Sequence, residues 1–249
     1  MLIGAYPLLG IALRSGTGHG VRGPALSGNV RGLLIVCGVE IILFSLVFGL
    51  GWLASRASRE ELLFRWRPGW WVVPLGIAYS VAIRFALFVV VMVVVVILLT
   101  THASTPETLQ GFVSANRPNV ETLVSVSAMR NNPSYFWLTV TLVSFVVAGL
   151  REEIWRAGTL AAMRALWPRA FASRGGQCLA VTLIAVLFGA MHLGMGPIAA
   201  AMAGVLGWLL GMIMVLHKSI WPAVIAHGLF DATTMAMLPW SLEKLQHFR

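Results

Sequence analysis

The stretch Leu150–Gly158, with the sequence LREEIWRAG, places four ionisable side chains inside a long apolar run. They are Arg151, Glu152, Glu153 and Arg156. Moving one charged side chain to the centre of a bilayer costs about 2.5 to 3.5 kcal/mol, so such residues usually face a polar cavity or one another. The stretch therefore predicts a functional site inside the membrane.

Helical spacing predicts different surroundings for the two glutamates. Arg156 follows Glu152 by four residues and Glu153 by three, so its guanidinium can reach either carboxylate on a helix. The two glutamates diverge by about 100° because one turn holds about 3.6 residues. We expect one glutamate to pair with Arg151 or Arg156 while the other faces a cavity.

The composition is that of a polytopic membrane protein. Of the 249 residues, 58% are hydrophobic and 11% are charged, and the mean hydropathy is +0.84. The net charge of +9 would suggest nucleic acid in a soluble chain, but here basic residues gather in short connections between apolar runs. That distribution is typical of the positive-inside rule. The two cysteines lie in or next to apolar runs and give no disulfide framework.

We predict an all-α fold, a polytopic transmembrane helix bundle of about six spans with an intramembrane catalytic cavity. The spans are expected near residues 32–54, 72–99, 136–166, 177–193, 198–216 and 220–238, the last of them ended by Pro239. The predicted parts are an N-terminal interfacial segment (1–31), two transmembrane helices (32–99), a polar loop (100–135), a four-helix catalytic membrane core (136–238) and a C-terminal tail (239–249).

Basic residues predict which connections face the cytoplasm. The connections 56–69, 164–174 and 217–219 together hold eight Lys and Arg residues, against two in the polar loop and two in the tail. This favours a cytoplasmic location for all three connections. The same assignment puts the N-terminal arginines on the outer side of the membrane, which disfavours it. These are Arg14, Arg22 and Arg31. Either the N-terminal segment is re-entrant or the number of spans differs by one.

The first two spans each contain one charged residue. Glu40 is predicted to snorkel or to pair with another helix rather than to act in catalysis. Arg84 on the second span is one candidate partner for it. A second Glu-Glu pair, Glu60 and Glu61, lies among arginines outside the apolar runs and predicts a solvated surface helix.

Two later spans carry further ionisable residues at helical spacing. Phe188 and His192 (FGAMH) share one helix face, and so do His227 and Asp231 (HGLFD). Asp231 is the only aspartate in the chain. For each group alone, a structural contact between helices is as good an explanation as a functional role. Because a Glu pair, a His and a His/Asp pair occur on three separate spans of one small protein, we expect them to converge on one cavity.

Glu, His and Asp side chains together can generate a hydrolytic nucleophile from water. A buried carboxylate can take the proton of a water held by an imidazole, while other groups stabilise the oxyanion. The same side chains can ligate zinc, but H-E-x-x-H is absent, so zinc is possible without being required and no other cofactor is expected. The absence of G-x-S-x-G disfavours nucleophilic serine chemistry.

The order Glu-Glu, F-x-x-x-H and H-x-x-x-D, each on its own predicted membrane helix, resembles the CAAX prenyl protease and bacteriocin-processing family of intramembrane endopeptidases. The resemblance covers about residues 136–238. It implies that Glu152 is the general base, that His192 orients the attacking water, and that His227 and Asp231 bind the oxyanion or position the base. The residues expected to support them are Glu153, Arg156 and Phe188.

Two positions depart from the pattern of that family. Its first motif is E-E-x-x-x-R-G, whereas here Arg156 comes one position early and Ala157 holds the usual arginine position. Both placements lie within one turn of Glu153, so Arg156 can still pair with it. Asp231 stands where many relatives have asparagine. An ionised carboxylate cannot donate to an oxyanion, so we assign Asp231 to orienting His227.

The sequence thus favours an intramembrane endopeptidase that cleaves a membrane-anchored or membrane-delivered peptide. Expected partners are that peptide and the lipid bilayer, with no nucleic acid, and the expected location is a bacterial cytoplasmic membrane. A proton-coupled transporter is an alternative, since buried Glu, Asp and His relays are equally expected there, but the chain lacks the repeated halves that such folds often show. A catalytically silent relative that binds a partner membrane protein is the other alternative.

Overall fold

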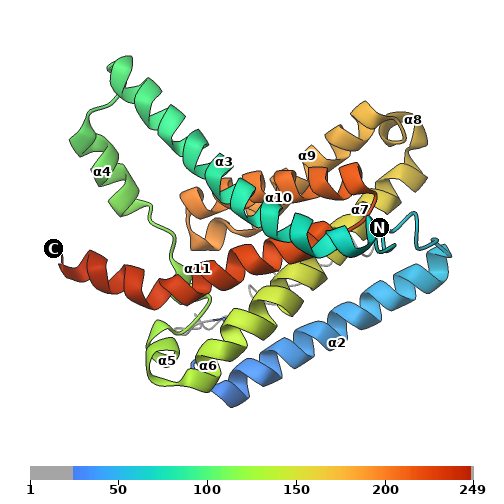
Figure 1. The fold of residues 1–249 in the computed structure, drawn as a ribbon, viewed down its shortest axis with the longest axis horizontal. Coiled ribbons are helices and arrows are strands. Elements are labelled where there is room, and N and C mark those ends of the chain that lie inside the picture. Colours follow the sequence, from blue (N-terminus) through green and yellow to red (C-terminus); the bar gives the residue numbers. More distant parts are fainter. Residues whose placement is uncertain (1–24, 248–249) are drawn as a thin grey trace, which may run out of the picture.

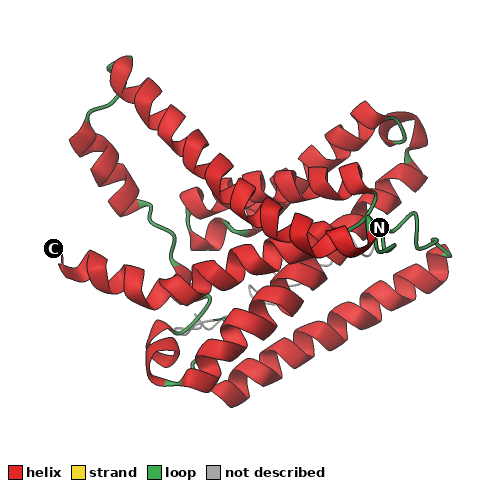
Figure 2. Cartoon of the chain, viewed as in Figure 1, coloured by secondary structure: helices red, strands yellow, loops and turns green. Residues whose placement is uncertain are grey.

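The computed structural model describes residues 25–247, and the side chains as far as Ser241. This part of the chain is helical, with no strand among the described residues (Figure 2). The main elements are α2 (Val30–Ser55), α3 (Val72–Thr100), α4 (Pro106–Ala115), α5 (Val126–Asn131), α6 (Pro133–Leu138), the π-helix η3 (Thr139–Leu150), α7 (Arg151–Leu166), α8 (Pro168–Phe171), α9 (Arg174–Met191), α10 (Pro197–His217) and α11 (Trp221–His247). The predicted all-α class is confirmed.

Five helical segments within residues 25–247 are long and apolar enough to cross a membrane. They are Val30–Ser55, Gly69–Thr100, Pro133–Leu166, Arg174–Met191 and Pro197–His217. The protein is therefore an integral membrane protein. The sixth predicted span corresponds to α11, which is long but less hydrophobic because it carries His227, Asp231 and two threonines.

The segments α6, η3 and α7 join into one helical rod of 34 residues. Twelve of these residues, Thr139–Leu150, are π-helical, and this stretch ends directly before the charged cluster. π-helical turns are rare and often occur at functional sites. The Glu pair lies just past the middle of the rod, where the helix returns to α-helical geometry.

The bundle is arranged around α11. This helix packs against η3, α3 and α10, while α9 packs against α10 and α2 contacts the α6–α7 rod. Figure 1 shows α11 crossing the molecule between α3 and the rod, with α2 on the outer side of the rod. A Cβ added at Gly149 would lie 3.1 Å from the Val224 carbonyl oxygen and 3.3 Å from Gly228 Cα. This close helix approach brings the Glu pair opposite His227.

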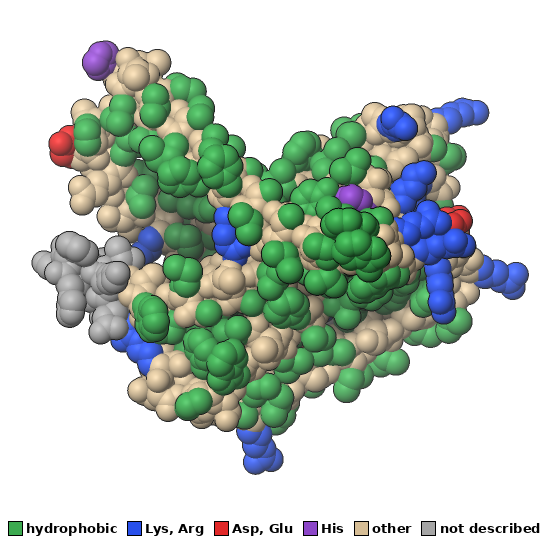
Figure 3. All heavy atoms as spheres, viewed as in Figure 1, with side chains coloured by type: hydrophobic (Ala, Val, Ile, Leu, Met, Phe, Trp, Pro, Cys, Tyr) green, Lys and Arg blue, Asp and Glu red, His purple; other side chains and the backbone are tan. Residues whose placement is uncertain are grey.

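The three basic connections lie together at one end of the bundle. Arg164 at the end of α7 donates to the Glu61 carbonyl at 2.6 Å, and the Ser219 hydroxyl donates to the Arg65 carbonyl at 2.8 Å. Figure 3 shows most of the visible Lys and Arg side chains at this end. The connections expected to share one side of the membrane therefore do lie together.

The second Glu-Glu pair is exposed, as predicted, but it lies in turns rather than in a surface helix. Glu60 forms ion pairs with Arg65 and Arg67, both at 3.1 Å. Hydrogen bonds from Ser58 hold the pKa of Glu61 below its usual range. The chain is held in turns here because Ser58 and the glutamates satisfy local backbone and charged groups themselves.

The predicted polar loop 100–135 contains two short helices, α4 and α5. Thr105 caps α4, whose first residue is Pro106, and Ser125 caps α5. A capping hydroxyl and a first-turn proline both favour a helix start. None of the α4 residues is buried, and the helix lies away from the centre of the bundle (Figure 1).

The predicted end of the last span at Pro239 is wrong, because α11 continues through this proline to His247. Proline removes one helical hydrogen bond, but a helix that packs against neighbours can tolerate it. Arg130 donates to the Pro239 carbonyl at 2.7 Å and stabilises this turn. Of the predicted interfacial segment, residues 1–24 lie outside the described part, and so do residues 248–249 of the tail.

Candidate active site

Glu153 and Arg156 form the buried base of the charged cluster on α7. Their exposed fractions are 0% and 1%, and the two side chains form an ion pair across one helical turn. The early position of Arg156 therefore does not prevent the pair, because three-residue spacing also places the guanidinium over the carboxylate. A buried charge pair of this kind fixes both side chains, since separating them would leave a buried charge without its partner.

His227 joins α11 to this pair. Its Nδ1 lies 2.9 Å from Oε1 of Glu153. An ionised carboxylate only accepts hydrogen bonds, so the Nδ1–H of His227 donates and the ring orientation is fixed. The other ring nitrogen, Nε2, then faces Glu152 at 4.0 Å and Asp231 at 3.5 Å.

Glu152 differs from its neighbour because its side chain is 20% exposed. Its carboxylate lies 3.4 Å from Nη2 of Arg151 and 3.8 Å from Nη2 of Arg156. None of these contacts has the short, buried geometry of the Glu153 pair. Glu152 is thus the glutamate that a water or a substrate can reach.

Asp231 lies one turn after His227 and is 25% exposed at its side chain. It interacts electrostatically with Glu152, His192 and Arg156 in addition to His227. Asp231 of α11 therefore lies within electrostatic range of α7 and of His192 at the end of α9.

His192 ends α9, where its Nδ1 lies 2.8 Å from the Phe188 carbonyl oxygen. A carbonyl only accepts, so Nδ1 carries the proton and Nε2 of a neutral ring keeps its lone pair. Within the described residues His192 makes no direct hydrogen bond to Glu152. Its connection to the cluster is electrostatic, through Asp231.

Phe188 packs between the two halves of the site. It is buried, its ring centroid lies 4.6 Å from that of His192, and the Arg156 guanidinium carbon lies 4.0 Å from the same ring. A cation over an aromatic face is stabilised by the ring quadrupole. The predicted supporting residue thus joins α9 to the buried pair of α7.

The suggested Glu40–Arg84 pair is wrong. Glu40 pairs instead with Arg151 at 3.0 Å. Arg84 donates to the Phe230 carbonyl and to the Ser80 hydroxyl, both at 2.7 Å, and so holds α3 to α11. A signal for the true pair is present in the sequence. Arg151 has no acidic residue three or four positions away, so its distant partner must come from another helix.

No group of three or more His, Cys, Asp or Glu side chains that could hold a metal ion is found among the described residues. The ring nitrogen of His227 nearest to Glu153 is already used as a hydrogen-bond donor. The arrangement is that of carboxylates and imidazoles around a water-accessible glutamate.

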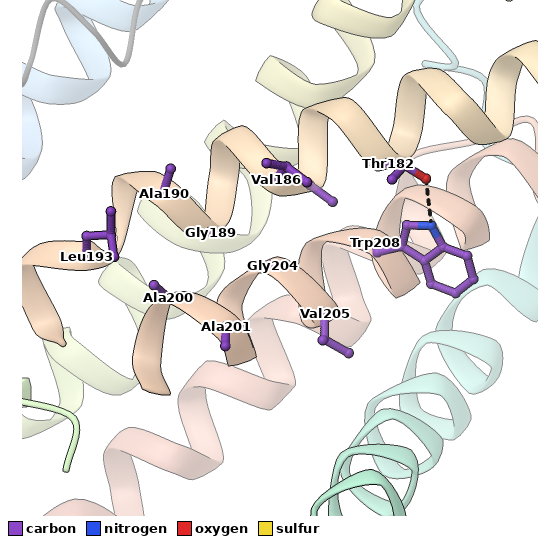
Figure 4. Close-up of a pocket in the computed structure, with 11 residues that line it drawn as sticks. Thr182, Val186, Gly189, Ala190, Leu193, Ala200, Ala201, Gly204, Val205 and Trp208 are labelled. Carbon is purple, nitrogen blue, oxygen red and sulfur yellow. Dashed lines mark hydrogen bonds between the residues drawn. The ribbon is translucent and has the colours of Figure 1, made fainter. Parts of the chain in front are cut away.

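An apolar groove of about 390 Å³ runs between α9 and α10 (Figure 4). Small residues leave it open, and a Cβ at Gly189 would come within 2.7 Å of the Ala200 carbonyl oxygen. Trp208 donates to the Thr182 hydroxyl at 3.2 Å on its wall. Leu193, which directly follows His192, also lines the groove. The groove thus reaches the residue that follows His192 in the sequence.

A comparison with known protein families found a match to the segment that contains all of the candidate site residues; Glu40, the partner of Arg151, lies outside it. Residues 133–233 match the family described as type II CAAX prenyl endopeptidase Rce1-like. The match begins with α6 and ends two residues after Asp231, and it confirms the resemblance suggested by the motifs. No curated protein and no solved structure matched the chain.

Proposed function

We propose that this protein is an intramembrane endopeptidase, because residues 133–233 match the family described as type II CAAX prenyl endopeptidase Rce1-like. Its substrate is a membrane-anchored or membrane-delivered peptide, and it works in a bacterial cytoplasmic membrane. The observation that carries the proposal is the contrast between the two glutamates. Glu153 is fully buried and doubly paired, while Glu152 is partly exposed and surrounded by the other candidate residues.

Glu152 is the general base in the proposed reaction. It takes a proton from a water molecule while the water oxygen attacks the carbonyl carbon of the scissile peptide bond. The carbonyl electrons move to its oxygen to give a tetrahedral oxyanion. When the oxyanion collapses, the C–N bond breaks and Glu152 returns the proton to the leaving amine. The products are a new carboxyl terminus and a new amine.

The two histidines have separate tasks in this reaction. His192, with Nδ1–H held by the Phe188 carbonyl, offers the Nε2 lone pair to the attacking water. His227 is fixed through Nδ1 by Glu153, so Nε2 is directed toward Glu152 and Asp231. We assign Asp231 to orienting His227, and His227 to positioning Glu152.

A catalytically silent relative is less well supported by the geometry. The departure that raised this alternative is the early position of Arg156. That arginine nevertheless pairs with Glu153 and packs over Phe188. The buried half of the cluster is therefore intact in this sequence.

The test is cleavage of a membrane-anchored peptide in vesicles that contain the purified protein, with the products identified by mass spectrometry. Matched peptides with and without a prenyl chain report whether the lipid is required. Cleavage is expected for the parent and lost in Glu152→Gln and His192→Ala, while Glu61→Gln serves as an exposed carboxylate control. Proton flux across the vesicles with no cleavage would instead favour a transporter, and parental cleavage by both site variants would overturn the proposal.

A further inference from the structure

A second pocket, of about 740 Å³, lies at the basic end of the bundle and shares no residue with the candidate active site. The connection between α2 and α3 lines it, together with Trp221 at the start of α11. One candidate membrane span ends at Ser55, before this connection, and the next begins at Gly69, after it. The pocket therefore lies at a membrane surface, at the level of the lipid headgroups.

The pocket carries a net positive charge, because three arginines and one glutamate line it. Oε1 of Glu60 is shared by two of these arginines, at 3.1 Å from Nε of Arg65 and 3.1 Å from Nη2 of Arg67. The exposed guanidinium of Arg59 forms no ion pair with another described residue. The single carboxylate thus leaves guanidinium donors for an anion, and a guanidinium fits the oxygens of a phosphate.

The wall of the pocket is built by contacts between two connections that lie far apart in the chain. The carbonyls of residues 63–65 accept hydrogen bonds from residues 219–221, at 2.9, 3.0 and 2.8 Å in the order of the acceptors. The ring of Trp66 packs against that of Trp221, with the centroids 5.3 Å apart. The backbone that carries the arginines is therefore held in place before a ligand binds, which lowers the cost of binding.

Exposed apolar side chains continue from this connection along the start of α3. Trp70 and Trp71 are exposed and stacked, with ring centroids 3.9 Å apart, and tryptophan is enriched at the headgroup level of membranes. Val73, Ile77 and Val81 follow at intervals of four residues and are also exposed, so they share one helix face. Figure 3 shows the Lys and Arg side chains at this end directly beside hydrophobic surface. The surroundings thus combine a cationic pocket with an apolar surface for acyl chains.

We propose that this pocket binds the phosphate of an anionic phospholipid, whose acyl chains lie along the exposed face of α3. Basic pockets at the ends of membrane helices suit such headgroups, because the phosphate meets several cations at once. A zwitterionic lipid fits less well, since its ammonium group would meet the same positive charge. The proposal concerns lipid binding alone and does not depend on the endopeptidase reaction.

The experiment is native mass spectrometry of the purified full chain in detergent, titrated with phosphatidylglycerol or with phosphatidylcholine. The parent should bind one phosphatidylglycerol at least about fivefold more tightly than phosphatidylcholine. Arg59→Gln and Arg67→Gln should each weaken the binding of phosphatidylglycerol by about fivefold, the usual contribution of one basic residue at an anionic lipid surface. Arg169→Gln is the matched control, because it removes an exposed arginine from the neighbouring basic connection that does not line the pocket. Its affinity should equal that of the parent.

Three results would overturn the proposal. Equal weakening by Arg169→Gln would show that the overall positive charge of this end attracts the lipid, without a defined site. Equal affinity for the two lipids would show that the headgroup charge is not recognised. Displacement of phosphatidylglycerol by an equal concentration of soluble glycerol 3-phosphate would identify a free phosphate compound, and not a lipid, as the ligand.

The two arginine variants also separate binding from folding. Arg67→Gln loses an ion pair with Glu60, whereas Arg59→Gln loses no ion pair with a described residue. If Arg67→Gln is not recovered folded, Arg59→Gln therefore decides, and parental affinity in that variant would contradict the assignment. Failure of the endopeptidase proposal is recognised separately, because no peptide is cleaved in this experiment.

Discussion

Replacing Glu153 by glutamine removes the negative charge that the Arg156 guanidinium and the His227 ring both contact. The substitution keeps the size of the side chain, so it creates no cavity. It leaves Arg156, which is 1% exposed, as a buried cation without its main partner. We expect Glu153→Gln to weaken the fold at the centre of the bundle.

The expected loss in the free energy of unfolding follows from the burial of the pair. Removing one partner from a buried ion pair typically costs about 3 to 5 kcal/mol, because the remaining charge stays buried. Glu152→Gln is the matched comparison on the adjacent residue. Arg151 retains Glu40 and Arg156 retains Glu153 in that variant. The free energy of unfolding should therefore fall by only about 1 kcal/mol or less, as for partly exposed pairs.

The assay is unfolding of both variants in lipid–detergent mixtures by titration with a denaturing detergent, followed by tryptophan fluorescence. Trp155 is buried, and it lies in the sequence between Glu153 and Arg156, so its fluorescence reports on this region. The Glu153→Gln variant should unfold at a clearly lower concentration of the denaturing detergent than the Glu152→Gln variant. Equal loss of stability in both would show that the pair is simply structural and that the proposed division of roles is wrong.

Three further substitutions test the packing and orientation of the site. The Cβ of Gly189→Ala would lie 2.7 Å from a backbone oxygen of α10, so this substitution should lower the melting temperature and reduce the free energy of unfolding by about 1 to 3 kcal/mol. The control is Gly49→Ala, whose Cβ would enter open space and should leave the melting temperature unchanged. Equal melting of the two would contradict the close α9–α10 approach. Phe188→Leu removes the ring between Arg156 and His192 and should cost about 1 to 2 kcal/mol and lower kcat, and unchanged turnover would refute its supporting role. Asp231→Asn should retain more cleavage than Asp231→Ala, because its side-chain amide can still hydrogen-bond to Nε2 of His227 and orient the ring. Equal rates would argue against an orienting role.

The charged stretch on α7 could be interpreted from sequence because its cost in a membrane is large and its spacing is local. Helical periodicity alone places Arg156 within reach of both glutamates. The structure adds which glutamate is buried, and that depends on the approach of Gly149 to Gly228 on α11. A contact between residues so far apart in the chain has no signature in local spacing.

Glu40 shows where a single sequence is insufficient. It was expected to snorkel or to pair with another helix, and the partner suggested for it was Arg84. Which of several membrane arginines a carboxylate meets depends on the helix order, since α2 packs on the α6–α7 rod while α3 packs on α11. The π-helical segment was not predicted either, because its apolar composition fits an α-helix equally well.

The prediction of helix ends was limited because its rules describe helices in soluble proteins. Proline at position 239 predicts the end of a helix in water, but α11 passes through it and its carbonyl accepts from Arg130. The segment 100–135 was predicted as a polar loop from its prolines. Two of them instead start helices, since Pro106 and Pro133 occupy first-turn positions after capping side chains.

The most direct test of the central claim, that Glu152 activates the attacking water, is the single-turnover rate of peptide cleavage by Glu152→Gln in vesicles. The rate is normalised to the folded fraction determined by the detergent titration. A glutamine cannot accept the proton, so the rate should fall by at least about 100-fold while the fold is preserved. Cleavage by folded Glu152→Gln at the parental rate would contradict the account.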